Sequence, residues 1–142
     1  ILSATEIDVN YNINSLTGST GIIMGALGGA PDTAAGAKLT VVVAPTMRKR
    51  IPIITDKVTT VVTPGETVDV LVTERGICVN PKRPDLIEIL TAAGIPLKTI
   101  EELKEEVEKL TGVPEKISLS DTVVAVVEYR DGTVIDVVRQ AK

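Results

Sequence analysis

The sequence predicts an α/β fold, and three stretches of the 142-residue chain carry that prediction. The apolar run KLTVVVAP, residues 38–45, is typical of a strand covered on both faces in a parallel or mixed sheet. The stretch KTIEELKEEVEKLTGVP, residues 98–114, repeats its apolar residues with the period of a helix. Two valine-rich segments around Asp131-Gly132 predict a β-hairpin over residues 121–142. A chain of this length is most simply one domain, residues 1–142.

The first half of the chain predicts short strands separated by turns. Residues 1–14, ILSATEIDVNYNIN, predict a strand, a polar turn and an extended piece, because apolar and polar residues alternate. We expect TMRKR, residues 46–50, to be an exposed basic connection. Residues 51–80 predict strands broken at Asp56 and at Pro64-Gly65, where proline before glycine predicts a type II turn. Beyond that turn, one side of a strand should carry Val68, Val70 and Val72.

Two helices are expected late in the chain. RPDLIEILTAAG, residues 83–94, predicts a helix that ends at Gly94, with one apolar face made of Leu86, Ile89, Leu90 and Ala93. The second helix should begin at a capping box formed by Thr99 and Glu102 and end near Gly112 and Pro114. Its buried stripe is predicted to comprise Ile100, Leu103, Val107 and Leu110.

Composition excludes several classes of function. The net charge is −4, the 15 basic residues form no stripe, and Tyr11 and Tyr129 are the only aromatic residues, so nucleic acid is not an expected partner. No apolar run is long enough for a transmembrane helix, and no membrane partner is expected. The absence of His excludes Ser-His-Asp and Cys-His arrangements within the chain, and one Cys without His predicts no zinc or other metal site. The single Cys and the lack of a signal peptide favour a cytoplasmic setting.

Glycine is concentrated in GALGGAPDTAAGAK, residues 25–38. The stretch fits neither G-x-G-x-x-G nor G-x-x-x-x-G-K-[ST]. Gly28 and Gly29 would allow the backbone to approach a ligand closely, and Asp32 and Thr33 are candidate N-caps for a short helical turn. Such a loop can direct backbone N–H groups at an anion, as in sites for phosphate and for the oxyanions of acyl transfer, or it can be only a tight structural turn.

Other candidate groups are interpreted as structural. Glu6 and Asp8 could line a cleft, although a solvated strand end is the expectation. Glu74 and Arg75 are expected to form a local ion pair. Cys78 lies among apolar neighbours and is predicted to be a small core residue.

Two long stretches resemble a known family. GALGGAPDTAAGAKL (25–39) and VTTVVTPGETVDVLVTERGICVNPKRPDL (58–86) are similar to the α subunit of citrate lyase, the citrate CoA-transferase subunit. Almost the whole chain resembles the C-terminal part of that subunit. The shorter pattern from Gly28 to Asp32 is shared with CoA-transferases more broadly. The first residues, ILSATEIDVN, lack Met and already suggest a strand, which also predicts a C-terminal fragment of a longer polypeptide.

The resemblance implies an activity and partners. It implies a CoA-transferase-like mixed sheet with flanking helices, of which this chain is the last section of the second half. Citrate would exchange with acetate on the thioester of an acyl carrier (gamma) subunit, through a mixed anhydride, and a β subunit would then cleave the citryl thioester. The CoA-derived prosthetic group would belong to the carrier, and this chain would bind no cofactor of its own. An oligomer is also implied.

The resemblance places catalytic residues upstream of Ile1, so no catalytic residue is assigned here and the isolated chain is expected to be inactive. Our hypothesis is that Gly28, Gly29 and Ala30 supply backbone to the acyl or CoA-like group, while Asp32 orients the loop. Two alternatives stay open. The chain could be a non-catalytic assembly module of the complex, or part of a related transferase that acts on citramalate.

Overall fold

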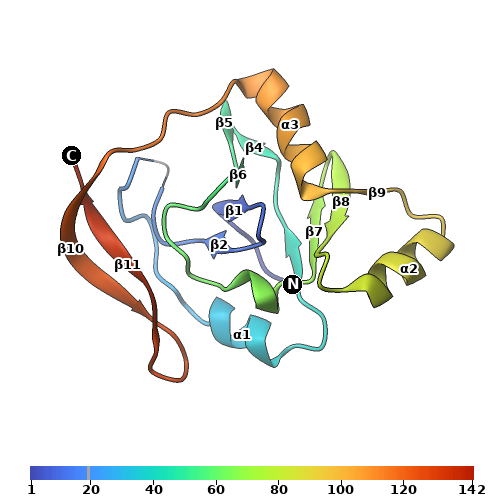
Figure 1. Cartoon of the computed structure of the whole chain (residues 1–142), viewed down its shortest axis with the longest axis horizontal. Helices are drawn as coiled ribbons and strands as arrows, with labels where there is room; N and C mark the ends of the chain where they lie inside the picture. Colours follow the sequence, from blue (N-terminus) through green and yellow to red (C-terminus); the bar gives the residue numbers. More distant parts are fainter. Residues whose placement is uncertain (19) are drawn as a thin grey trace.

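The computed structural model describes residues 1–18 and 20–142, and it shows a mixed α/β arrangement of several small sheets and three α-helices (Figure 1). A four-stranded sheet has the order β3-β7-β8-β9 and a three-stranded sheet the order β2-β1-β6. Each sheet contains parallel and antiparallel pairs. The strands of these two sheets are β1 (Glu6–Asp8), β2 (Ile13–Asn14), β3 (Val41–Val43), β6 (Ile54–Thr55), β7 (Val70–Thr73), β8 (Gly76–Val79) and β9 (Leu97–Lys98).

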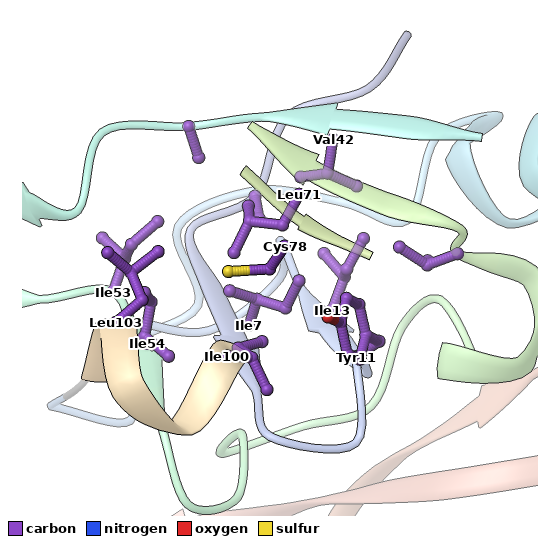
Figure 2. Packing of buried hydrophobic residues seen from close by; sticks show 13 residues of the cluster. Ile7, Tyr11, Ile13, Val42, Ile53, Ile54, Leu71, Cys78, Ile100 and Leu103 are labelled. Carbon is purple, nitrogen blue, oxygen red and sulfur yellow. The ribbon is translucent and has the colours of Figure 1, made fainter. Parts of the chain in front are cut away.

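The core lies between these two sheets and helix α3 (Ile100–Thr111) (Figure 2). Cys78 is fully buried in it, as predicted, and the pKa of its thiol is raised to about 12 by burial. Aliphatic side chains surround the sulfur because the chain has no Phe or Trp to fill the interior. The labelled members of the cluster in Figure 2 are Ile7, Tyr11, Ile13, Val42, Ile53, Ile54, Leu71, Cys78, Ile100 and Leu103.

Helix α3 confirms the predicted capping box. The Thr99 hydroxyl accepts a hydrogen bond from the backbone N–H of Glu102 (3.1 Å), and the Glu102 carboxylate accepts one from the N–H of Thr99 (2.9 Å). Three of the four predicted stripe residues are buried, whereas Leu110 is 52% exposed. Gly112 ends the helix at a φ of 77°, a conformation that glycine adopts without strain.

Helix α2 (Pro84–Ala92) is also confirmed, and Gly94 follows it at a φ of 74°. It crosses over between the parallel strands β8 and β9 and stands at the edge of the molecule (Figure 1). However, none of its residues is buried, and Ile89 is 62% exposed. The apolar face predicted for this helix is therefore not buried in this chain.

Three further expectations need correction. The run at β3 is not covered on both faces, because Val42 is buried while Val43 is 47% exposed. The basic stretch TMRKR is not a plain connection: β4 (Met47–Arg48) pairs with β5 (Ile51–Pro52) around an exposed turn with Lys49 at a φ of 58°. The predicted side of the next strand is confirmed only for Val70 and Val72, because β7 begins at Val70 and Val68 precedes it.

The predicted type II turn at Pro64-Gly65 is also wrong. Such a turn needs a positive φ at Gly65, but Gly65 has none and instead begins the 3₁₀ helix η1 (Gly65–Thr67). Glycine is required there for a different reason, because a Cβ would lie 2.0 Å from the backbone oxygen of Asn10.

The predicted terminal hairpin is confirmed as β10 (Leu119–Glu128) and β11 (Val134–Ala141). It lies beside the body of the molecule, and Val127 and Val138 are its buried residues (Figure 1). Its outer valines are exposed: Val123, Val124, Val126 and Val134. Within residues 1–18 and 20–142, no helix is both long and apolar enough to cross a membrane.

Candidate functional site

The glycine loop leads into α1 (Ala30–Gly36). Asp32 and Thr33 do not cap this helix, which corrects the expectation from sequence. The helix begins earlier, with Gly29 as the N-cap residue and Pro31 in the first turn, where proline's missing N–H and fixed φ are tolerated. Asp32 instead lies within the first turn, the position where a carboxylate favours the positive end of a helix.

The two adjacent glycines have different roles in the backbone. Gly28 has a φ of 56°, in the left-handed region that favours glycine. Gly29 has φ −92° and ψ 7°, which other residues adopt, and a Cβ there would meet only the Thr33 hydroxyl at 4.0 Å. Folding of this chain therefore explains glycine at 28 but not at 29.

Backbone donors of the loop are available. Among the described residues, no hydrogen-bond partner is found for the N–H groups of Gly28, Gly29 or Ala30, while the carbonyl of Gly29 accepts from Thr33 (2.9 Å). Gly28 and Gly29 are exposed and Ala30 is half-buried. The loop can thus offer main-chain donors to a group outside this chain.

Asp32 has its side chain 63% exposed, and its carboxylate lies 3.8 Å from the Arg130 guanidinium at the tip of the terminal hairpin. In the described part of the chain, no donor of the loop forms a hydrogen bond with this carboxylate, whose ionic contact is with Arg130. Its contact is thus with the hairpin.

Glu6 and Asp8 are not a solvated strand end, which corrects the expectation. They are 5% and 1% exposed. Asp8 accepts hydrogen bonds from the N–H groups of Asn10 (2.9 Å), Asn12 (3.0 Å) and Val58 (3.3 Å), and it thereby closes the turn after β1. Their alternation in TEIDVNYNIN was a usable signal, because it places both carboxylates on one face of a strand.

The glycine loop lines neither of two cavities, of about 310 and 230 Å³, that lie in the described part of the chain. The larger is bordered by Glu6 and by the segments 51–59 and 113–119. The smaller lies between Tyr11, the start of α3 and Ile87 of α2. Burial raises the pKa of Tyr11 well above its usual value.

The predicted local ion pair of Glu74 with Arg75 is present, and Glu74 also contacts Thr46. Its carboxylate accepts hydrogen bonds from the backbone N–H of Thr46 (3.0 Å) and from the Thr46 hydroxyl, and its distance to Arg75 is 3.8 Å. Partial burial would raise the pKa of Glu74, but these hydrogen bonds lower it overall. The shorter ionic contact of Arg75 is with Glu106, at 3.4 Å. No group of three or more His, Cys, Asp or Glu in the described part of the chain is arranged to hold a metal ion.

Comparison with known proteins gives consistent matches. A family model described as "Citrate lyase, alpha subunit (CitF)" matches residues 1–141. The citrate lyase alpha chains of Klebsiella pneumoniae, Haemophilus influenzae and Escherichia coli are 61%, 57% and 55% identical over all 142 residues. A Streptococcus mutans crystal structure, assigned to the alpha subunit of citrate lyase and solved in complex with citrate, is 54% identical over 99% of this chain, with a TM-score of 0.95. The chain spans 28% of the length of each of these proteins.

Proposed function

Because the chain belongs to the citrate lyase alpha-subunit family, we propose that it contributes a substrate-contacting loop to the acyl-exchange step of citrate lyase. In that step, a carboxylate of citrate replaces acetate on a carrier thioester, so that a citryl thioester and free acetate result. The expected partners are the β subunit and the acyl carrier subunit, in the cytoplasm and within an oligomer. A CoA-transferase-like fold for the complete subunit is part of the same proposal.

The observation that supports this proposal is that the N–H groups of Gly28, Gly29 and Ala30 have no hydrogen-bond partner among residues 1–18 and 20–142. Attack of a carboxylate on a thioester places negative charge on the carbonyl oxygen. Fixed backbone donors stabilise that charge without reorganising, and loss of one oxyanion-hole donor costs about 3 kcal/mol in a well-studied acyl-transfer site. Open space around Gly28 and Gly29 also fits the approach of a carrier-borne, CoA-derived arm, which supplies the thioester when bound.

The test is Gly29→Val in a full-length citrate lyase alpha chain that carries this segment. A branched side chain would block approach to the loop, and we expect the transfer rate to fall about 100-fold. Gly36→Val is the matched control, since Gly36 also has open space around it but lies at the other end of α1. Circular dichroism should show both variants folded. If Gly29→Val turns over citrate as fast as Gly36→Val, the loop is only a turn.

One alternative is an assembly role, favoured by the exposed valines of the terminal hairpin. A hairpin with an apolar outer face can pack on a neighbouring subunit. A module of this kind should bind neither carrier nor CoA-like ligand, and Val126→Ser should weaken subunit association without changing carrier binding. For the second alternative, citramalate should compete with citrate on the full-length enzyme if it is the natural acid.

A further inference from the structure

One face of the four-stranded sheet β3-β7-β8-β9 forms part of the core, and its second face carries an apolar row. Residues paired across neighbouring strands lie on the same face of a sheet, and consecutive residues of a strand lie on opposite faces. Val42, Leu71 and Cys78 pair with one another on the core face. The row on the second face takes one residue from each of the four strands: Val43, Val72, Ile77 and Leu97.

The described chain covers this row only in part. Helix α3 packs on the opposite, core face of the sheet. Helix α2 stands at the β9 end of the row, where its Ile87 borders the smaller cavity together with Leu97. At the β3 end, Val43 is 47% exposed, and the two residues between these ends are half-buried.

The residues of this sheet are typical of one that is buried on both faces. Parallel strand pairs occur almost only in such sheets, and both β3-β7 and β8-β9 are parallel. A sheet with one solvated face alternates apolar and polar residues along its strands. In contrast, VVV in β3 and ICV in β8 are apolar at consecutive positions, and all four members of the row are aliphatic.

Chain length and the position of Leu2 indicate what covers the second face. The chain spans 28% of the length of the citrate lyase alpha chains that it matches, so most of such a subunit lies outside this structure. Leu2 forms a parallel bridge with Val42 at the outer edge of β3. Its N–H donates to the Val41 oxygen and its oxygen accepts from the Val43 N–H, both at 2.9 Å. In a full-length alpha chain, polypeptide joined to Ile1 would therefore arrive beside Val43, and the N-terminus lies next to this sheet in Figure 1.

We propose that the second face of this sheet is an internal interface of the full-length alpha subunit. Apolar side chains from the part of the subunit joined to Ile1 cover Val43, Val72 and Ile77. Because that part belongs to the same polypeptide, its effective concentration at the face is high, and the face is covered in each single subunit. This inference rests on membership of the family and does not depend on the acyl exchange proposed above.

The experiment measures the reaction rate of a thiol at position 43. Val43→Cys is made in a full-length citrate lyase alpha chain that carries this segment, prepared without the β and carrier subunits. The native chain reacts with a charged methanethiosulfonate, and mass spectrometry of its peptides gives the label at each cysteine. If the face is covered, Cys at position 43 should react at least about 100-fold more slowly than in the urea-unfolded chain, because a buried thiol is inert.

Two further thiols calibrate this rate. Cys78 is fully buried in the core and should be equally slow in the same sample. Glu105→Cys, at an exposed position of α3, gives the rate of an accessible thiol in the folded chain. An uncovered thiol at position 43 should react within about tenfold of the unfolded chain, since about half of the Val43 side chain is exposed here. That result would overturn the proposal.

The identity of the covering partner is tested by concentration and by adding subunits. Cover from the same polypeptide gives the same slow rate at every protein concentration, with or without the β and carrier subunits. The proposal is also overturned if dilution speeds the reaction, which indicates a second copy of the alpha chain, or if protection appears only after the other subunits are added.

A measurement on the unsubstituted protein covers the case that Val43→Cys does not fold. Carbene footprinting of the full-length alpha chain compares Val43 with its neighbour Val42, which is fully buried in the core. Equal, low labelling of the two valines supports the proposal. Labelling of Val43 several-fold above that of Val42 contradicts it.

Discussion

Substitution of Gly65 by alanine should be among the most destabilising single-methyl changes in this chain. Gly65 touches the turn after β1 so closely that a Cβ would lie 2.0 Å from the Asn10 oxygen, 2.8 Å from the Asn12 nitrogen and 2.8 Å from the Tyr11 carbonyl carbon. All three are backbone atoms, so no side chain can rotate away.

The magnitude follows from the shift that alanine would force. A real Cβ essentially never approaches another atom closer than 3.0 Å, so the two backbones must separate locally by roughly 1 Å. Two hydrogen bonds of 2.9 Å hold Gly65 in place: its N–H donates to Asn12 Oδ1 across this contact, and its oxygen accepts from Asn80 Nδ2 on the other side. Strain of about 2 kcal/mol and two lost hydrogen bonds of about 1 kcal/mol each give a destabilisation of about 4 kcal/mol.

The assay is urea unfolding monitored by circular dichroism. The slope m of the unfolding free energy against urea concentration should be the same in the variant and the parent chain, which shows that the same transition is compared. A loss of about 4 kcal/mol corresponds to a melting temperature lower by about 12 °C for a chain of this size. Gly36→Ala is the matched control, because a Cβ there meets nothing within 4 Å in α1, and it should stabilise by up to about 1 kcal/mol. If Gly65→Ala costs less than about 1 kcal/mol, the close approach is not a constraint and our reasoning fails.

Three further outcomes are expected. Leu103→Ala should destabilise the chain by about 3 kcal/mol in urea unfolding, because Leu103 is fully buried in the core; a loss below about 1 kcal/mol would contradict that packing. The pKa of Glu74 is lowered in the folded chain, so the contacts of its carboxylate with Thr46 stabilise the fold fully above the ordinary pKa of 4.5. This stabilisation is lost as the pH falls through the lower pKa of the folded state. Glu74→Gln should therefore flatten the pH dependence of the unfolding free energy below pH 4.5. The raised pKa and burial of Cys78 predict that a thiol reagent at pH 8 labels it only after unfolding; rapid labelling of native protein would refute this.

Local patterns explain which parts of the fold could be predicted. The capping box of α3, the glycines after both later helices and the turn of the terminal hairpin are signalled by residues within a few positions of one another. Cys78 was recognisable as a core residue from its apolar neighbours. These features needed no knowledge of distant contacts.

Long-range contacts explain the errors. The N–H of Gly65 donates a hydrogen bond to the side chain of Asn12, 53 positions away. Rules for turns consider only neighbouring residues and cannot predict that contact. Glu6 and Asp8 looked solvated because the segments that cover them, including Val58 and Thr59, lie about 50 residues further along the chain. The glycine loop could be located from composition, but the start of α1 at Ala30 depended on Pro31 in the first turn rather than on the polar side chains that follow.

The exposure of α2 has a consequence for how this segment can vary. The helix connects β8 to β9 so that the two strands pair in parallel. Because none of its side chains is buried, its main structural role is to span the distance between the two strands. Packing in the core of this chain therefore restricts the sequence of α2 only weakly. Another crossover of similar length should allow β9 to pair with β8 equally well. Grafting a foreign helix between Asn80 and Leu97 would be a direct way to engineer this chain.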